Sequence, residues 1–152
     1  MNPTQFAEGE DLEKYPRNLE RDLQLCKEHE VDFVFTPRME DIYKENASTY
    51  IVEKSVSEKL CGQFRPSHFK GVTTICAKLF NLCRPTFVAL GQKDAQQVSV
   101  LKRMIEDLHF PIEVFVGPIV RETDGLAMSS RNVYLNDTQR EDARLIFQAL
   151  IT

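Results

Sequence analysis

The chain has 152 residues, of which 42% are hydrophobic and 28% are charged, and these values are ordinary for a globular protein with its own core. Nineteen Lys and Arg residues against 23 Asp and Glu residues give a net charge of −4, so composition does not indicate a nucleic-acid-binding or membrane-binding protein. No apolar run is long enough to span a bilayer and Met1–Gln5 does not have the pattern of a signal peptide, which favours a cytoplasmic location.

The first part of the chain predicts one helix and two short strands. Pro16 precedes a helix over Arg17–Glu30, whose apolar residues are spaced for one helical face. The β-rich run Val31–Phe35 predicts a strand, and Thr49–Val52 predicts a weaker one. Gly and Pro residues interrupt Cys61–Gly71, which indicates a loop.

The middle of the chain predicts a strand–helix–strand unit after a long helix. An apolar stripe over Val72–Arg84 predicts a helix that Pro85 ends. Thr86–Leu90 and Ile112–Val116 are apolar on both faces, as buried parallel strands are. Between them we expect a helix capped by Asp94. Its predicted buried face consists of Val98, Leu101, Ile105 and Leu108. This order predicts a right-handed βαβ unit with ligands at the carboxyl ends of its strands.

The last segment predicts a helix that begins with a capping box. Asn136 and Gln139 have the required spacing. The apolar residues of that helix are Leu145, Ile146, Ala149 and Leu150. Because no strand precedes Asn2 and the chain stops inside this helix, we expect an α/β Rossmann-like parallel sheet that is incomplete at both ends.

The four cysteines do not have CxxC spacing, and no metal site is expected from them. Cys76 and Cys83 lie seven residues apart on an apolar helical stripe, which predicts reduced core thiols. Among the histidines, His68 could be taken for a catalytic base, but a loop histidine with local hydrogen bonds is the favoured interpretation. The acidic stretch Glu8–Glu13 is interpreted as a solvated face rather than a metal site.

Two short segments combine the residue types that hold phosphate. Gly91–Gln97 reads GQKDAQQ at a strand end, and Asp124–Arg131 reads DGLAMSSR in a loop. A Lys supplies a point charge, an Arg a planar fork, hydroxyls small donors, and glycines close backbone approach. Lys93 and Asp94 alone could form a solvated helix cap. Together, the two segments indicate a nucleotide triphosphate site.

Six motifs in a fixed order resemble the pantoate–β-alanine ligase family of the nucleotidylyltransferase superfamily. They are Asn2–Phe6, Tyr15–Arg17, Arg65–Gly71, Lys78–Asn81, Gly91–Gln97 and Asp124–Arg131. The resemblance implies a ligase with a Rossmann-like domain that joins ATP and pantoate into pantoyl adenylate and releases diphosphate. β-Alanine then attacks the acyl carbon to give pantothenate and AMP, in the biosynthesis of coenzyme A.

The resemblance also assigns roles to residues. Gln5 and Gln97 would hold pantoate, and Gln5 would also approach β-alanine. The ATP-binding residues would be Gly91, Gln92, Lys93, Asp94, Val120, Met128, Ser129, Ser130 and Arg131, with Val120 near the adenine. Charge builds on phosphate oxygens during adenylate formation, so the expected catalytic residues are Lys93, Ser129, Ser130 and Arg131. Mg²⁺ would sit on the phosphates with most of its waters retained.

The same resemblance predicts how the chain is divided. Residues 1–118 would be the C-terminal portion of the nucleotide-binding domain and 119–152 the start of a smaller, truncated C-terminal domain, in a family that is usually homodimeric. The family carries an HxGH motif, and none of His29, His68 and His109 stands in that pattern. A second hypothesis therefore stays open, namely a catalytically incompetent nucleotide-binding fragment or assembly module.

Overall fold

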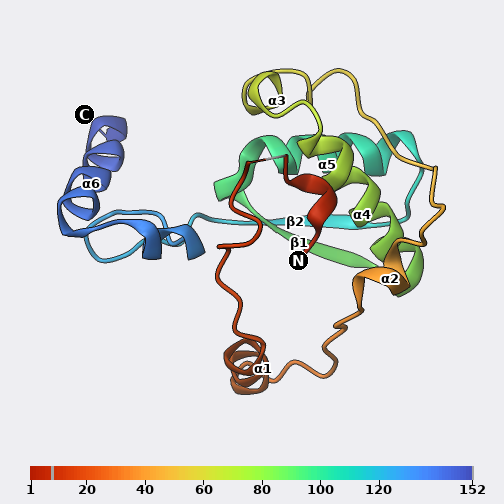
Figure 1. The fold of residues 1–152 in the computed structure, drawn as a ribbon, viewed down its shortest axis with the longest axis horizontal. Helices are drawn as coiled ribbons and strands as arrows, with labels where there is room; N and C mark the ends of the chain where they lie inside the picture. The colour runs from red at the N-terminus through yellow and green to blue at the C-terminus, as the bar shows by residue number, and fades with distance from the viewer. Residues whose placement is uncertain (8, 152) are drawn as a thin grey trace.

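The computed structural model describes residues 1–7 and 9–151. At its centre, β1 (Phe87–Gly91) and β2 (Glu113–Gly117) form a parallel sheet in which Phe87 pairs with Glu113 and Gly91 with Gly117. The remaining elements are the helices α1 (Leu19–Glu28), α2 (Met39–Ile42), α3 (Cys61–Phe64), α4 (His68–Cys83), α5 (Ala95–Asp107) and α6 (Asp137–Ile151), and the 3-10 turns η1 (Pro3–Gln5), η2 (Gln92–Asp94) and η3 (Ser130–Tyr134). The predicted strand–helix–strand unit is confirmed, with α5 connecting two parallel strands (Figure 1).

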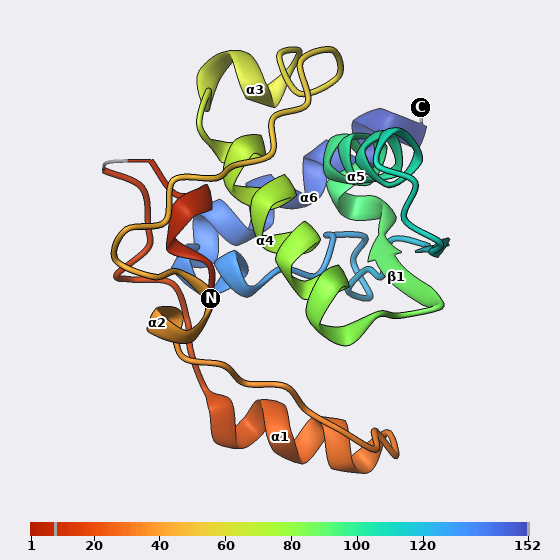
Figure 2. The ribbon, with the colours of Figure 1, turned by 90° about the vertical axis from the view of Figure 1, so that its right-hand side faces the viewer.

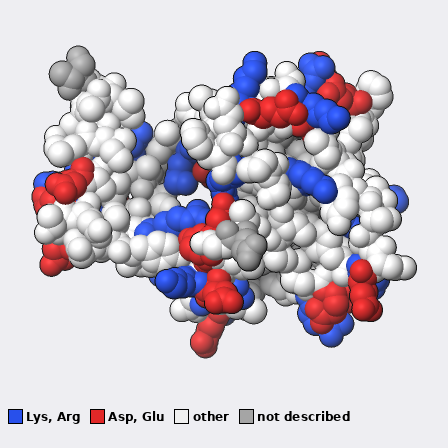
Figure 3. Space-filling model, turned by 45° about the horizontal axis from the view of Figure 1, so that its top comes forward, with Lys and Arg blue, Asp and Glu red and all other residues white. Residues whose placement is uncertain are grey.

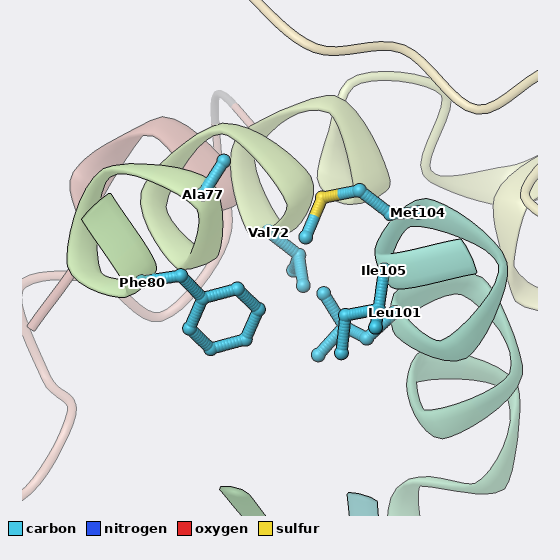
Figure 4. Packing of buried hydrophobic residues seen from close by; sticks show 6 residues of the cluster. All are labelled: Val72, Ala77, Phe80, Leu101, Met104 and Ile105. Carbon is cyan, nitrogen blue, oxygen red and sulfur yellow. The ribbon is translucent and has the colours of Figure 1, made fainter. Parts of the chain in front are cut away.

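The core lies between α4, α5 and one face of the sheet. Leu101 is fully buried, and Phe80 packs edge-on against Phe110 with 5.7 Å between the ring centroids. Six buried side chains form this cluster: Val72, Ala77, Phe80, Leu101, Met104 and Ile105. Figure 4 shows Val72 and Phe80 from α4 facing the three side chains from α5, while Ala77 lies higher on α4. Val88, Leu90 and Val114 pack against it from the strands. The apolar periodicity of both helices therefore builds the layer that supports the sheet.

The opposite face of the sheet is open in the described residues. Phe87 and Phe115 are 63% and 64% exposed, so the expectation that both faces of these strands are buried is wrong here. The predicted buried face of α5 also needs one correction, because Leu108 follows the helix as its C-cap and is 47% exposed. Met104 takes its place in the core.

Helix α4 begins at His68, four residues earlier than the apolar stripe predicts, and a short helix, α3, precedes it. The expected loop over Cys61–Gly71 is therefore mostly helical. The first turn of α4 buries Phe69, which gives that turn a tertiary contact that its Gly and Pro neighbours do not signal. At the other end Arg84 adopts the left-handed conformation as C-cap, and Pro85 follows as predicted.

The two predicted strands near the N-terminus are not strands. Val31–Phe35 is not paired as a strand with any described segment, and Phe33 is 93% exposed. Thr49–Val52 is held instead by α4, since Thr74 Oγ1 accepts the Ile51 N–H at 3.0 Å and Thr73 Oγ1 donates to the Ile51 carbonyl at 2.7 Å. Two side-chain hydroxyls thus replace the partner strand that β-propensity alone cannot supply.

Helices α1 and α6 both stand apart from the sheet in Figure 1, and Figure 2 again shows α1 on a long connection. The capping box of α6 is confirmed, because Asn136 N–H donates to Gln139 Oε1 at 3.1 Å and Gln139 N–H donates to Asn136 Oδ1 at 2.9 Å. Its apolar side chains Leu145, Ile146 and Leu150 are exposed. No helix among the described residues is long and apolar enough to cross a membrane.

The cysteines are free, but only one of the two predicted core thiols is buried to any extent. Burial raises the pKa of Cys76 to about 11, whereas Cys83 is exposed at the end of α4. The prediction that Cys83 is a core thiol is therefore wrong, because Cys83 is the last residue of α4 and is exposed. A thiol with the pKa of Cys76 stays protonated and unreactive near neutral pH.

Replacing Leu101 with Ala should lower the free energy of unfolding by about 2–5 kcal/mol, because the side chain is fully buried and its loss leaves a cavity. Leu108→Ala, on the exposed end of the same helix, should cost less than about 1 kcal/mol. Urea denaturation of both variants tests this, and equal losses would contradict the described core.

Candidate functional site

A cavity of about 520 Å³ lies where η1, the start of α4, the start of α5 and the loop before η3 converge. Its lining residues are Met1, Asn2, Gln5, Phe6, Tyr15, Arg65, His68, Lys93, Asp94, Gln97, Met128, Ser129, Ser130 and Arg131. The space-filling view shows a hollow between the lobe that ends in α6 and the main body, with basic and acidic side chains meeting at its rim (Figure 3). A larger cavity of about 650 Å³ lies beside α1 and contains none of the predicted site residues.

The structure brings together eight of the eleven residues that the sequence nominates. Those that line the cavity are Gln5, Lys93, Asp94, Gln97, Met128, Ser129, Ser130 and Arg131. Gly91 ends β1 and Gln92 begins η2, so both lie just outside the lining. Val120 is 64% exposed, and its carbonyl accepts the Met128 N–H at 3.0 Å, which places it at the base of the loop.

The η1 wall is held by a network that the sequence interpretation missed. Asn2 Nδ2 donates to Gln5 Oε1 at 3.1 Å and to the Gly71 carbonyl at 3.2 Å. The Tyr43 hydroxyl donates to Asn2 Oδ1 at 2.9 Å. Gln5 Oε1 is thereby engaged, and its amide Nε2 remains a donor for a ligand. In the sequence, the only indication of a role for Asn2 is its position at the start of the motif Asn2–Phe6.

Close backbone approach makes that wall possible. A Cβ at Gly71, in the first turns of α4, would lie 2.2 Å from the Thr4 carbonyl oxygen and 2.6 Å from the Gln5 nitrogen. Only glycine lets η1 sit directly on the helix at this point. This close contact explains why α4 has a glycine in its first turn, although glycine within a helix costs about 1 kcal/mol relative to Ala.

Arg65 and His68 also line the cavity and were not nominated. His68 is the first residue of α4, and its Nδ1 lies 2.9 Å from the Gln5 carbonyl oxygen. Since a carbonyl only accepts, Nδ1 carries the proton, and burial lowers the pKa of His68 so that the ring is neutral near pH 7. The expectation of a loop histidine with local hydrogen bonds is therefore wrong. His68 is a helical residue, and its hydrogen-bond partner Gln5 lies 63 positions away in the sequence.

The α5 side contributes Lys93, Asp94 and Gln97. Lys93 Nζ lies 3.2 Å from Asp94 Oδ1, and both side chains are exposed to the cavity. Asp94 stands at the N-cap position of α5 but makes no side-chain capping bond, so that prediction is wrong. The Asp94 carboxylate is instead paired with the neighbouring Lys93. The adjacent Gln96 instead pins the preceding loop, because its Nε2 donates to the Val56 carbonyl at 3.0 Å.

Arg131 enters the cavity already paired. Its Nε and Nη2 donate to the two oxygens of Asp11 at 2.7 and 2.9 Å, and the guanidinium lies 5.1 Å from the centre of the Tyr15 ring. The Tyr134 hydroxyl donates to the same carboxylate at 3.2 Å. The Arg131 hydrogen bonds lower the pKa of Asp11 to about 2.

The acidic stretch is therefore not simply a solvated face. Besides Asp11, Glu10 accepts from Arg65 Nε at 2.6 Å, and that bond lowers the pKa of Glu10. Glu8 lies outside the described residues. Within the described part of the chain, no group of three or more His, Cys, Asp or Glu residues could hold a metal ion.

A small hairpin supports the loop Met128–Arg131. Arg121 pairs with Ala127 in an antiparallel bridge, and Gly125 turns between them with φ of 94°. The ring of Phe147 on α6 occupies the space that a Cβ at Gly125 would need, and it carries the Arg121 guanidinium 4.0 Å from its centroid. These contacts fasten the hairpin to α6.

Comparisons with known proteins agree on one family. The family model described as Pantoate-beta-alanine ligase matches residues 1–152. The chain is 54% identical over 150 residues to the pantothenate synthetase of Thermoanaerobacter sp. (strain X514), covering 99% of this chain and 53% of that protein. It is 53% identical to the pantothenate synthetase of Thermodesulfovibrio yellowstonii. The chain thus spans about half the length of the curated relatives it matches.

Solved structures give the same result for the fold. The pantothenate synthetase of Thermus thermophilus superposes with a TM-score of 0.96 at 48% identity, over 99% of this chain and 55% of that one. The pantoate-beta-alanine ligase of Francisella tularensis, complexed with beta-gamma ATP and beta-alanine, has a TM-score of 0.93 at 36% identity. It covers all of this chain, which in turn spans 59% of that structure. The expected α/β fold is confirmed.

Gly71→Ala should displace η1 and lower the free energy of unfolding. Overpacking costs about 1–3 kcal/mol and here meets backbone that cannot rotate away, which outweighs about 1 kcal/mol of helix propensity gained. The NMR signals of the Gln5 side-chain amide should also shift, because Gln5 belongs to η1. Gly91→Ala, with open space around the added carbon, should stay within about 0.5 kcal/mol. An unshifted Gln5 amide in Gly71→Ala would contradict the described contact.

Asp11 should titrate far below an ordinary carboxyl group. Because its folded pKa is about 2 against 3.8, the pair stabilises the fold fully above pH 3.8 and this stabilisation is lost as the pH falls toward 2. Carboxyl ¹³C NMR measures the pKa directly. Arg131→Gln should return it toward 3.8 while Glu10, paired with Arg65, keeps its lowered pKa. Titration of wild-type Asp11 near 3.8 would rule out the pair.

Proposed function

This chain belongs to the pantoate–β-alanine ligase family, and on that premise we propose that a protein carrying it condenses pantoate with β-alanine at the expense of ATP. The reaction would pass through pantoyl adenylate and yield pantothenate, AMP and diphosphate. The observation that carries the proposal is the convergence of Lys93, Gln97 and Arg131, from separate parts of the chain, on one cavity beside Gln5. Two cationic side chains can bind the triphosphate of ATP, and neighbouring side-chain amides can bind the carboxylate of the acid substrate.

In the first step a pantoate carboxylate oxygen attacks the α-phosphorus of ATP, and the bond to the diphosphate leaving group breaks. Negative charge then grows on the departing oxygens. Lys93 and Arg131 supply positive charge at the cavity, while Ser129 and Ser130 supply hydroxyl donors. Gly91, Gln92, Asp94, Val120 and Met128 would complete the ATP site, with Gly91 and Gln92 acting from the end of β1 through backbone approach. Such groups lower the barrier because they are in place before the charge develops.

In the second step the β-alanine amine attacks the acyl carbon of pantoyl adenylate, loses a proton, and AMP leaves. Gln97 and the free Nε2 of Gln5 would hold pantoate, and Gln5 would also contact β-alanine. The Asn2 bond to Gln5 Oε1 fixes which end of that amide faces the ligand. A glutamine held this way donates to a carboxylate or hydroxyl without adding charge.

Mg²⁺ is part of the proposal as the companion of the ATP phosphates. Such an ion usually keeps several waters and binds through substrate phosphates rather than through a protein cage. The cavity fits this arrangement, because its cations and donors leave the phosphates to supply the ligands. When bound, Mg²⁺ would neutralise part of the negative charge on the phosphates.

Several further assignments follow the family. We place residues 1–118 in the nucleotide-binding domain and 119–152 at the start of a smaller one, which is supported by Pro118 following β2 and by the separate position of α6 (Figure 1). A homodimer is the proposed assembly and the cytoplasm the proposed location. The four free cysteines suit a reducing compartment. Pantoate and β-alanine are the proposed small-molecule partners, with no nucleic acid or membrane.

The similarity to named synthetases over 99% of the chain supports the ligase above the second hypothesis of a non-catalytic module. That hypothesis rests on the absence of an HxGH motif around His29, His68 and His109. The retained cavity residues weigh more, because a module that only assembles has no need of amides and cations around one space.

Lys93→Ala, made in a protein of the relatives' full length that carries these residues, should slow pantoate-dependent exchange of diphosphate into ATP. The expected loss is about 2–4 kcal/mol of transition-state stabilisation, or roughly 30- to 1,000-fold in rate. The free energy of unfolding should change by less than about 0.5 kcal/mol. Lys102→Ala, on the exposed side of α5, is the matched control and should exchange at the wild-type rate. Near wild-type exchange by Lys93→Ala would contradict the assignment.

A further inference from the structure

Two adjacent carboxylates connect the short segment 9–15 to arginines in different walls of the cavity. Glu10 receives both Nε and Nη2 of Arg65, which lies just before α4. Asp11 receives both Nε and Nη2 of Arg131, which lies in η3 after the hairpin. The two arginines are 66 positions apart in the sequence (131 − 65), so consecutive carboxylates bridge two distant parts of the site.

The segment that carries these carboxylates is itself fixed. The Asp11 carbonyl accepts the Tyr15 N–H at 2.8 Å and the Lys14 N–H at 3.1 Å, which closes a turn on that residue. The Glu10–Arg65 pair anchors the position immediately before it, with both side chains mostly shielded from solvent. Asp11 is thus presented to Arg131 from an anchored turn rather than from a free loop.

The geometry of the pair leaves Arg131 able to bind a second anion. A guanidinium has five N–H donors, and Asp11 engages one edge, formed by Nε and Nη2. The other edge, formed by Nη1 and the second proton of Nη2, makes no contact with Asp11 and is available to a phosphate. Tyr15 under the guanidinium and the Tyr134 hydroxyl on Asp11 further restrict rotation of the pair.

We propose that Asp11 is a positioning residue for Arg131, holding its guanidinium so that the free edge meets the triphosphate during adenylate formation. This inference rests on the proposed function. Asp11 acts through Arg131 and does not touch the reacting atoms. The opposite role, a carboxylate that competes with ATP for Arg131, predicts tighter ATP binding when Asp11 is removed. The competing role is therefore distinguished from the positioning role by tighter ATP binding when Asp11 is removed.

Asp11→Asn keeps the size of the side chain and removes its charge and one acceptor. In a full-length protein carrying these residues, the rate of diphosphate exchange should fall about 10- to 100-fold, as expected when a reacting group is misplaced by a fraction of an ångström to an ångström. Asp11→Glu, which keeps the charge, should recover part of that loss. Asp107→Asn is the matched control, since Asp107 accepts from Arg103 Nε at 3.0 Å on the exposed side of α5. It should exchange at the wild-type rate.

A second measurement separates positioning from general loosening of the site. Attack of β-alanine on supplied pantoyl adenylate involves no triphosphate, so Asp11→Asn should change that rate by less than about twofold. In an Arg131→Lys background, where the bidentate pair cannot form, Asp11→Asn should add little further loss. Equal slowing of both half-reactions, an additive loss in the Arg131→Lys background, or tighter ATP binding by Asp11→Asn would each overturn the proposal.

The wild-type protein distinguishes this inference from the proposed function. If it shows no pantoate-dependent exchange, the ligase assignment fails whatever the Asp11 variants do. If it exchanges and Asp11→Asn matches it, the positioning role alone fails. Arginine Nε–H NMR adds a readout that needs no activity, because the Arg131 signal should be protected from solvent exchange in the wild type and lose that protection in Asp11→Asn.

Discussion

The candidate site depends on one steric constraint, the direct contact between the backbone of η1 and Gly71 of α4. Because no side chain separates the two elements, Asn2 reaches the Gly71 carbonyl and His68 reaches the Gln5 carbonyl. The contact between η1 and Gly71 also holds Gln5 against α4. This wall of the cavity therefore rests on the closely packed layer formed by α4, α5 and the sheet. A polar site is in this way built onto an apolar core with no loop between them.

Charge in the cavity is balanced locally rather than by the whole chain. Among the described residues, each of the three Lys and Arg side chains that line it has a carboxylate partner: Arg65 with Glu10, Lys93 with Asp94, and Arg131 with Asp11. An acidic protein can therefore present cations to an anionic ligand without a basic surface around them. Paired cations also discriminate better than bare ones, because a weak anion gains little by entering while a polyphosphate can use the free edges of several groups at once.

Sequence patterns predicted those parts of the fold that depend on neighbours along the chain. The β1–α5–β2 unit and the capping box of α6 are local patterns, and both were confirmed. Val31–Phe35 has strand propensity but needs a partner strand that periodicity does not reveal. Asp94 could cap a helix, yet the adjacent Lys93 takes its carboxylate. The Asp11–Arg131 pair spans 120 positions, and nothing in either residue's surroundings indicates it. The two phosphate-holding segments nonetheless supply seven of the fourteen residues that line the cavity, since these residue types are uncommon in combination, and the family resemblance added Gln5.

The fastening of the hairpin to α6 has a consequence for how fast the site can change. An unattached loop of four residues moves in nanoseconds to microseconds, whereas a whole helix that moves as one body does so in microseconds to milliseconds. Gly125 lies against Phe147 and Asp124 pairs with Arg140 at 2.7 Å, so Met128–Arg131 cannot travel far unless α6 travels with it. A displacement of this loop should therefore follow the slower, collective motion of α6 rather than the faster motion of a free loop.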